Sequence, residues 1–286
     1  MNRSVHRRTR AVQLAVGGTA VLLALSACSS GDDSSDASAS SSASSPSAAS
    51  SADTSASPAD NLTGTVTVFA AASLKETFTE LGKQFEAAHP GAKVAFNFGG
   101  SDTLAASITS GAPADVFAAA SPKTMKIVTD AKDASGEPQT FVRNQLEIAV
   151  VPGNPKKVDA LKDLTASGLK VALCAKEVPC GAAAQKALDA GGLKLTPVSY
   201  EQDVKSALTK VELKEVDASL VYKTDVKAAG GKVEGVEFPE SAKVINDYPI
   251  VLLKDAPNAE AAKAFIALVE SPEGAKVLSA AGFLNP

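Results

Sequence analysis

The feature that most constrains the fold is the alternation of strand-like and helix-like segments from Leu62 to Pro286. Short β-branched or apolar runs are followed by segments in which apolar residues recur three or four positions apart. This alternation is typical of α/β domains, and no internal repeat accompanies it. We expect strands at 65–68, 93–98, 115–120, 146–151, 169–174, 218–222 and 248–253.

The end of the first expected strand carries the first candidate site residue. Thr65–Val68 runs through three alanines into Ser73, and a helix is expected to begin at about Leu74. Ser73 and Glu76 match the Ser-x-x-Glu capping-box pattern. The same stretch also presents unpaired backbone N–H groups and a hydroxyl at the positive end of a helix, which suits an anion. Ser73 is therefore either a helix cap or part of an anion site.

The next strand-to-helix junction repeats this arrangement. Gly99 and Gly100 follow the strand and Ser101 begins a short helix. The two glycines would let a ligand approach the backbone closely. Two consecutive junctions of the same design favour an anion-binding function for both serines.

The first 27 residues are typical of an export signal. Four arginines precede an apolar run at 11–25, which is too short and wrongly flanked for a stable membrane span. Small residues just before Cys28 resemble the bacterial lipobox, in which the cysteine is lipidated. The alternative is an ordinary signal peptide with an incidental cysteine.

The segment that follows, 28–61, is predicted to be a disordered tether. Between Ser29 and Asp60 there is no Val, Leu, Ile, aromatic residue, Lys or Arg, so nothing offsets the entropy of ordering. A coil of this length spans roughly 30 Å on average. We therefore expect an exported protein anchored by lipid to the outer face of the cytoplasmic membrane.

Charge restricts the partners. Removing 1–27 takes away four arginines and no acid, which leaves 24 basic against 32 acidic residues, a net charge of −8. No basic cluster is present, so nucleic acid is not an expected partner. Arg143 is the one arginine left, so an anion site built on bidentate arginine clamps is disfavoured.

The body contains two cysteines and little sign of catalysis. Cys174 and Cys180 form an even pair in an exported chain, which favours a disulfide over two free thiols. His89, the single histidine of the body, is expected in a solvated loop beside a Pro-Gly turn. No nucleophile motif, phosphate loop or metal cluster is present, so no catalytic residue is assigned. Acidic residues at helix starts are interpreted as caps, namely Asp102, Asp203 and Asp225.

Five motifs in register resemble those of periplasmic molybdate-binding proteins, the solute receptors of molybdate ABC importers. The resemblance covers about Thr65 to Leu284. The motifs are Val68–Leu74, Gly111–Phe117, Val178–Gly181, Glu201–Val204 and Leu220–Tyr222.

The resemblance implies a two-lobed type II periplasmic-binding-protein fold with a hinge and an interlobe cleft for one tetrahedral oxyanion. Ser73 and Ser101 would bind molybdate, or tungstate, through hydroxyl and backbone N–H groups. The backbone N–H groups of Cys180 and Val204 and the phenol of Tyr222 would complete the site, with no protein atom bound to the metal itself. Cys180 departs from the family, which usually has a small residue without a thiol there. Without its companions, Tyr222 would be interpreted as a core aromatic residue.

The family also implies boundaries and partners. Lobe one would comprise 62–142 and 247–286, and lobe two 143–246. We expect a monomeric, non-enzymatic receptor that delivers its anion to a membrane permease. One alternative keeps the fold with sulfate or phosphate as ligand, and an acceptor from Asp102 or Glu201 in the cleft would favour phosphate. An alternative of another class is an exported lipoprotein hydrolase, which would need a nucleophile and base that the sequence does not supply.

Overall fold

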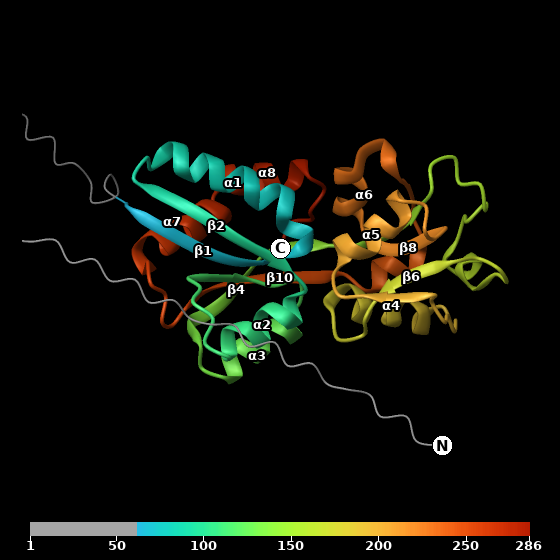
Figure 1. Cartoon of the computed structure of the whole chain (residues 1–286), viewed down its shortest axis with the longest axis horizontal. Helices are drawn as coiled ribbons and strands as arrows, with labels where there is room; N and C mark the ends of the chain where they lie inside the picture. Colours follow the sequence, from blue (N-terminus) through green and yellow to red (C-terminus); the bar gives the residue numbers. More distant parts are fainter. Residues whose placement is uncertain (1–61) are drawn as a thin grey trace, which may run out of the picture. The chain divides into compact units, whose positions relative to one another are not determined.

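The computed structural model describes residues 62–286 (Figure 1). The predicted signal peptide, Cys28 and the predicted tether all lie outside this range. Within the described residues no helix is both long and apolar enough to cross a bilayer. These residues form an α/β structure with two five-stranded mixed sheets, as the alternation predicted.

The first sheet has the strand order β2-β1-β3-β10-β4. The strands β1, β2 and β3 are parallel, whereas β10 runs antiparallel to both of its neighbours. The bounds are β1 (Gly64–Ala71), β2 (Ala92–Gly99), β3 (Val116–Ala118), β4 (Ala134–Asn144) and β10 (Asn246–Leu253).

Alternating side chains bury both faces of this sheet. In β1, Val68 and Ala70 belong to the main core cluster, whereas Phe69 between them belongs to a second cluster on the other face. Figure 1 shows α1, α7 and α8 over one face and α2 and α3 over the other. The bounds are α1 (Lys75–Ala88), α2 (Ser101–Thr109), α3 (Pro122–Asp130), α7 (Ala259–Glu270) and α8 (Pro272–Ala280).

The second sheet has the order β7-β6-β8-β5-β9, with β6 parallel to β7 and β8 and with β5 antiparallel to β8 and β9. One helix, α4, covers one face, and α5 and α6 cover the other (Figure 1). The strands are β5 (Leu146–Val150), β6 (Val171–Cys174), β7 (Ser199–Glu201), β8 (Ala218–Tyr222) and β9 (Glu234–Val236). The helices are α4 (Pro179–Ala190), α5 (Val204–Glu212) and α6 (Lys223–Ala229).

The disulfide prediction is confirmed. Cys174 ends β6 and Cys180 lies in the first turn of α4, and their sulfur atoms are bonded. The bond closes a six-residue separation and so ties the second sheet to the start of its covering helix. That helix begins at Pro179, a residue well suited to the first helical position.

Two local predictions are wrong. Ser73 does not cap α1: it lies in the 3-10 turn η2 (Ala72–Leu74), and no side chain caps the helix that begins at Lys75. Three strands, β4, β7 and β9, were not predicted. In β4, Gly136 and Pro138 interrupt the pattern. Both residues are tolerated because β4 is an edge strand with irregular register.

Asp115 fixes the first sheet to α7. The residue is fully buried, and its carboxylate accepts hydrogen bonds from the backbone N–H of Thr67 (2.7 Å) and of Asn258 (2.6 Å). These bonds join β1, the residue preceding β3 and the residue preceding α7. Buried polar groups are tolerated when they are paired in this way.

We predict that Asp115→Ala destabilises the fold because it leaves both N–H groups without an acceptor. The free energy of unfolding should fall by about 2–4 kcal/mol, since each unpaired buried donor costs about 1–3 kcal/mol. Chemical denaturation measures this. The matched control is Asp130→Ala, which removes an exposed carboxylate paired with Lys126 and should change stability little. Equal losses in the two variants would contradict the assignment.

Candidate functional site

The five predicted site residues line one small cavity between the two sheets. The free space in the cavity is about 10 Å³, far below the usual range for organic ligands, so only a compact guest would fit without opening it. Backbone and small side chains make up most of the lining, which consists of Ala71, Ala72, Ser73, Gly99, Gly100, Ser101, Ala120, Val178, Pro179, Cys180, Asp203, Val204 and Tyr222. The structure therefore brings together residues that lie up to about 150 positions apart in the chain.

The first sheet contributes both serines. Ser101 is the first residue of α2 and Ser73 lies in the turn before α1, and both are almost fully buried. The hydroxyl of Ser101 accepts a hydrogen bond from the backbone N–H of Ala120 (3.0 Å). The hydroxyl of Ser73 is 2.8 Å from the phenol oxygen of Tyr248. The Ser73 hydroxyl thus contacts a side chain in β10, where the sequence pattern suggested a local cap.

The second sheet contributes two helix starts. Cys180 is the second residue of α4 and Val204 the first of α5, so their N–H groups have no acceptor within their own helix. Both helices point the positive end of their dipole at the cavity. Asp203 caps α5, and its two carboxylate oxygens accept from the backbone N–H and the hydroxyl of Ser206, each at 2.9 Å. The prediction that Asp203 is a cap is confirmed.

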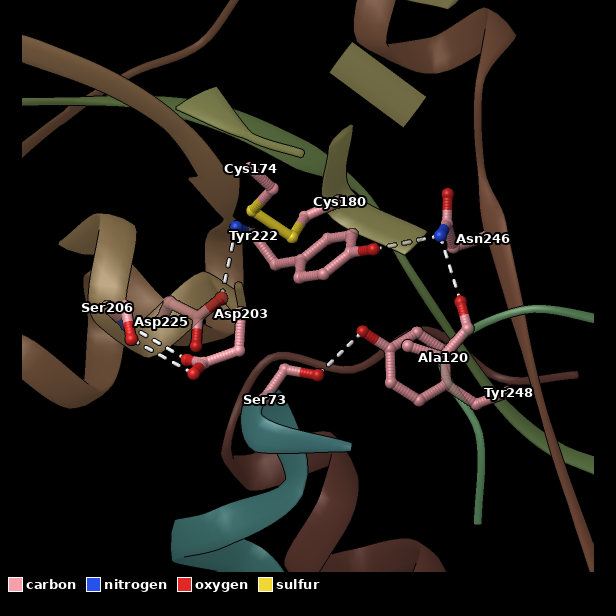
Figure 2. Close-up of a disulfide and its surroundings, with 10 residues drawn as sticks. All are labelled: Ser73, Ala120, Cys174, Cys180, Asp203, Ser206, Tyr222, Asp225, Asn246 and Tyr248. Atoms are coloured by element: carbon pink, nitrogen blue, oxygen red, sulfur yellow. Dashed lines mark hydrogen bonds between the residues drawn. A yellow bond between two sulfur atoms is a disulfide. The ribbon is translucent and has the colours of Figure 1, made fainter. Parts of the chain in front are cut away.

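Tyr222 ends β8 and lies on the cavity with 1 % of its surface exposed. Burial, with Tyr248 and Asp225 nearby, raises its pKa well above the ordinary value, so the phenol keeps its proton. Its oxygen accepts a hydrogen bond from the side-chain amide of Asn246 (2.8 Å), as Figure 2 shows. Sequence reasoning missed Asn246 and Tyr248, because no local pattern distinguishes them from ordinary strand residues.

No lysine, arginine or histidine lines the cavity. Arg143 instead pairs with Asp247 (2.7 Å), and both side chains are more than 40 % exposed. Asp102 and Glu201, the acceptors that would have favoured phosphate, are also absent from the lining. Apart from the carboxylate of Asp203, which already accepts from Ser206, the oxygen-bearing side chains on the lining are the neutral hydroxyl groups of Ser73, Ser101 and Tyr222. Among the described residues no group of three or more His, Cys, Asp or Glu could hold a metal ion.

Two glycines, Gly100 on the cavity and Gly181 beside it, allow close approach of backbone segments. A Cβ at Gly100 would lie 2.5 Å from the backbone oxygen of Gln202 on the opposite side. A Cβ at Gly181 would collide with the backbone of Ala175 in the loop that the disulfide closes. Neither glycine has an unusual backbone angle, so close approach is the reason for glycine at both positions.

A buried ion pair lies beside the cavity. Lys205 Nζ is 2.8 Å from Glu76 Oε2 on α1 and 3.1 Å from Asp225 Oδ1 on α6. Burial raises the pKa of Asp225, and attraction to Lys205 offsets this only in part. Burial alone would lower the pKa of Lys205, but Asp225 and Glu76 together raise it. The lysine therefore stays charged between the two carboxylates and links the two halves of the structure.

The chain is similar to known solute-binding proteins over its whole described part. Residues 66–284 match the family described as bacterial extracellular solute-binding protein. Molybdate-binding protein ModA of Mycobacterium tuberculosis is 43% identical over 234 residues, which cover 81% of this chain and 90% of that protein. A Bacillus subtilis protein described as a putative ABC transporter substrate-binding lipoprotein, YvgL, is 32% identical over 77% and 86% of the two chains.

Solved structures support the fold. The periplasmic molybdate-binding protein of Azotobacter vinelandii superposes with a TM-score of 0.68 at 23% identity, over 77% of this chain and 99% of that one. This likeness confirms the two-lobed periplasmic-binding-protein fold that the sequence motifs implied.

We predict that Lys205→Met destabilises the protein, because it leaves Asp225 buried without its cation. The loss should be about 2–3 kcal/mol, at the lower end for buried pairs because Lys205 remains 21% exposed. Chemical denaturation at pH 7 measures it. The control is Lys210→Met in the same helix, whose partner Glu215 is exposed, and this variant should be nearly as stable as the parent.

The cost of Lys205→Met should also depend on pH. Below the ordinary aspartate pKa of about 4, Asp225 is protonated in the folded and unfolded states, so losing the lysine costs little. As pH rises, the unfolded carboxyl ionises while the folded one must keep its proton or bury a charge. The destabilisation should therefore grow between about pH 4 and pH 7, and a constant difference across this range would contradict the buried-pair account.

Proposed function

This chain belongs to the bacterial extracellular solute-binding protein family, and we propose that it captures molybdate and delivers it to an ABC importer in the membrane. The proposal is supported by the 43% identity to a molybdate-binding protein over most of both chains. The observation that carries it from the structure is a small cavity lined by hydroxyl groups and helix starts, with no cationic side chain. As a member of a solute-binding family the chain is a binding protein rather than an enzyme.

Hydroxyl and N–H groups at the cavity suit molybdate because this anion needs only hydrogen-bond donors. Molybdate carries no hydrogen near neutral pH, so each of its oxygens accepts from the protein. Hydrogen phosphate brings an O–H group that needs an acceptor, and the one carboxylate on the lining, Asp203, already accepts from Ser206, so that hydrogen is poorly paired. Sulfate has the same hydrogen-bonding needs as molybdate, so size must separate these two ions.

We assign the contacts as follows. Ser73 and Ser101 donate through hydroxyl and backbone N–H groups, Cys180 and Val204 through backbone N–H groups, and Tyr222 through its phenol. The ion would then sit where several helix starts converge, and no protein atom would bind the metal itself. A main-chain contact at Cys180 explains why a disulfide-bonded cysteine is compatible with this position.

We further propose that the two lobes close on the ion by a hinge. Lobe one comprises 62–142 and 247–286, and lobe two comprises 143–246, so the chain crosses twice between them. Ligand that bridges both lobes would favour the closed state, and tungstate, which has the same shape and charge, would do so as well.

Attachment to the membrane through lipidated Cys28 completes the proposal. The basic and apolar leader and the small residues before Cys28 support it, as does the description of the B. subtilis relative as a lipoprotein. The serine- and alanine-rich segment would then let the body move near the importer while staying at the outer surface of the membrane.

We predict that Ser73→Ala combined with Ser101→Ala weakens molybdate binding at least a hundredfold, because two donors to a charged ligand are lost, each worth about 1.5–3 kcal/mol. Isothermal titration calorimetry measures this. The matched control is Ser107→Ala combined with Ser279→Ala, since Ser107 is half-buried on α2, Ser279 is exposed on α8, and neither lines the cavity. Unchanged affinity in the first double variant, with the fold intact, would refute the assigned site.

Thermal stabilisation by a panel of anions tests the ligand itself. Molybdate and tungstate should stabilise the parent protein strongly, by about 2.7 kcal/mol at one hundred times the dissociation constant. Sulfate should act less, and hydrogen phosphate least. Stabilisation by sulfate alone would favour the alternative oxyanion function.

We predict that Cys28→Ser releases the protein from cell membranes into the soluble extracellular fraction, because the sulfur that carries the lipid is lost. Fractionation and mass spectrometry of the mature N-terminus measure this. Molybdate affinity should not change. Retention of the serine variant in the membrane fraction would contradict lipid anchoring at this residue.

A further inference from the structure

The orientation of one side-chain amide is fixed by its surroundings. Asn246 Nδ2 lies 2.9 Å from the backbone oxygen of Ala120 and 2.8 Å from the phenol oxygen of Tyr222 (Figure 2). A backbone carbonyl oxygen can only accept, so the atom facing it must be the amide nitrogen. The second hydrogen of that nitrogen is therefore donated to Tyr222.

This donation decides what Tyr222 can offer the cavity. A phenol has one hydrogen, and its oxygen is already accepting from Asn246. The hydrogen cannot point back at the amide, so it can be donated only to a bound ion in the cavity that Tyr222 lines or to the neighbouring Tyr248 hydroxyl. Asn246 thus makes Tyr222 a donor toward any bound ion.

Ser101 is held in the same sense, and Ser73 lies against a second phenol. The backbone N–H of Ala120 donates to Ser101 Oγ at 3.0 Å, which leaves the serine hydrogen free for the cavity. Ser73 Oγ meets Tyr248 Oη at 2.8 Å, and Asn144 Nδ2 approaches that phenol at 3.4 Å. The backbone N–H of Gln145 donates to Asn144 Oδ1 (2.9 Å), so the nitrogen of this amide also faces the phenol. Either hydroxyl can donate in the bond between Ser73 and Tyr248.

We propose that Asn246 is a specificity-determining positioning residue: by donating to Tyr222, it directs the phenol hydrogen into the cavity and so selects anions that carry no hydrogen of their own. The inference rests on the proposed oxyanion-binding function and deepens it. Tyr222 touches the ion, and Asn246 acts only through Tyr222.

The decisive variant is Asn246→Asp, which has nearly the same shape but replaces the donor with an acceptor. Tyr222 would now donate to the carboxylate and turn an oxygen lone pair to the cavity. The added charge repels all doubly negative anions alike, so it cancels in a ratio of affinities. Hydrogen phosphate can donate to the lone pair whereas molybdate and sulfate cannot.

We therefore expect the ratio of molybdate to hydrogen phosphate affinity to fall at least about tenfold in Asn246→Asp, since one hydrogen bond to a charged group is exchanged for a mismatch. The ratio of sulfate to hydrogen phosphate affinity should fall similarly. Competition titrations on the purified protein at mildly alkaline pH measure both ratios. Asn246→Ala, which frees the phenol to turn either way, should shift both ratios in the same direction by less.

Two controls separate positioning from general damage. Asn285→Asp, the same change at an exposed position near the chain end, should leave both ratios unchanged. In a Tyr222→Phe background, Asn246→Asp should no longer move the ratios, because the group through which it acts is absent. A further full shift in that background would overturn the proposal.

The outcomes distinguish this inference from the proposed function. If the parent protein binds none of the tetrahedral anions, the function itself fails. If the parent binds molybdate and both Asn246 variants lose affinity for all anions by the same factor, the residue is merely structural and the positioning role is refuted. A change in ratio that depends on Tyr222 supports it.

Discussion

The site depends on a property of the backbone: the first N–H groups of a helix have no acceptor within that helix. A sheet whose strands lead directly into helices therefore presents unpaired donors at one edge. Here Ser101, Cys180 and Val204 each lie at the start of a helix, and Ser73 lies in the turn before another. The cavity lies where these starts from two sheets meet, so its chemistry follows from topology before any side chain is considered.

The charged residues nearby are each engaged with partners of their own. Lys205 lies between Glu76 and Asp225, and the oxygens of Asp203 are occupied by Ser206. A cation in the cavity would attract any anion through a long-range charge interaction. Fixed N–H and hydroxyl donors act over short distances, so they stabilise only an anion whose oxygens lie within hydrogen-bonding distance of them. Selective anion binding is thus compatible with a chain that has a single arginine, Arg143, after residue 27.

Local sequence patterns predicted most of the features that depend on neighbouring residues, such as where helices begin. The helix starts at Ser101 and Val204 and the disulfide follow from spacing and residue type, and the structure has them. The cap assigned to Ser73 was wrong because its partner, Tyr248, lies 175 positions away, and no local rule reports such a contact. Asn246 was missed for the same reason, since its two partners belong to different sheets. Contacts of this kind depend on how the two sheets pack against each other, and a single sequence does not show that packing directly.

Under the proposed function, the size and the hydrogen content of the bound anion are selected by different parts of the chain. The width of the cavity depends on close backbone approach, as at Gly100 against Gln202, where any side chain would force the walls apart. Hydrogen content depends on which way the hydroxyls point, and Ala120 couples the two lobes in this respect. Its N–H donates to Ser101, while its carbonyl fixes the amide that donates to Tyr222. Cavity width and hydroxyl direction depend on separate residues, so either property can change while the other is kept. The same two-lobed fold can therefore be adapted to anions that differ only in size or only in hydrogen content.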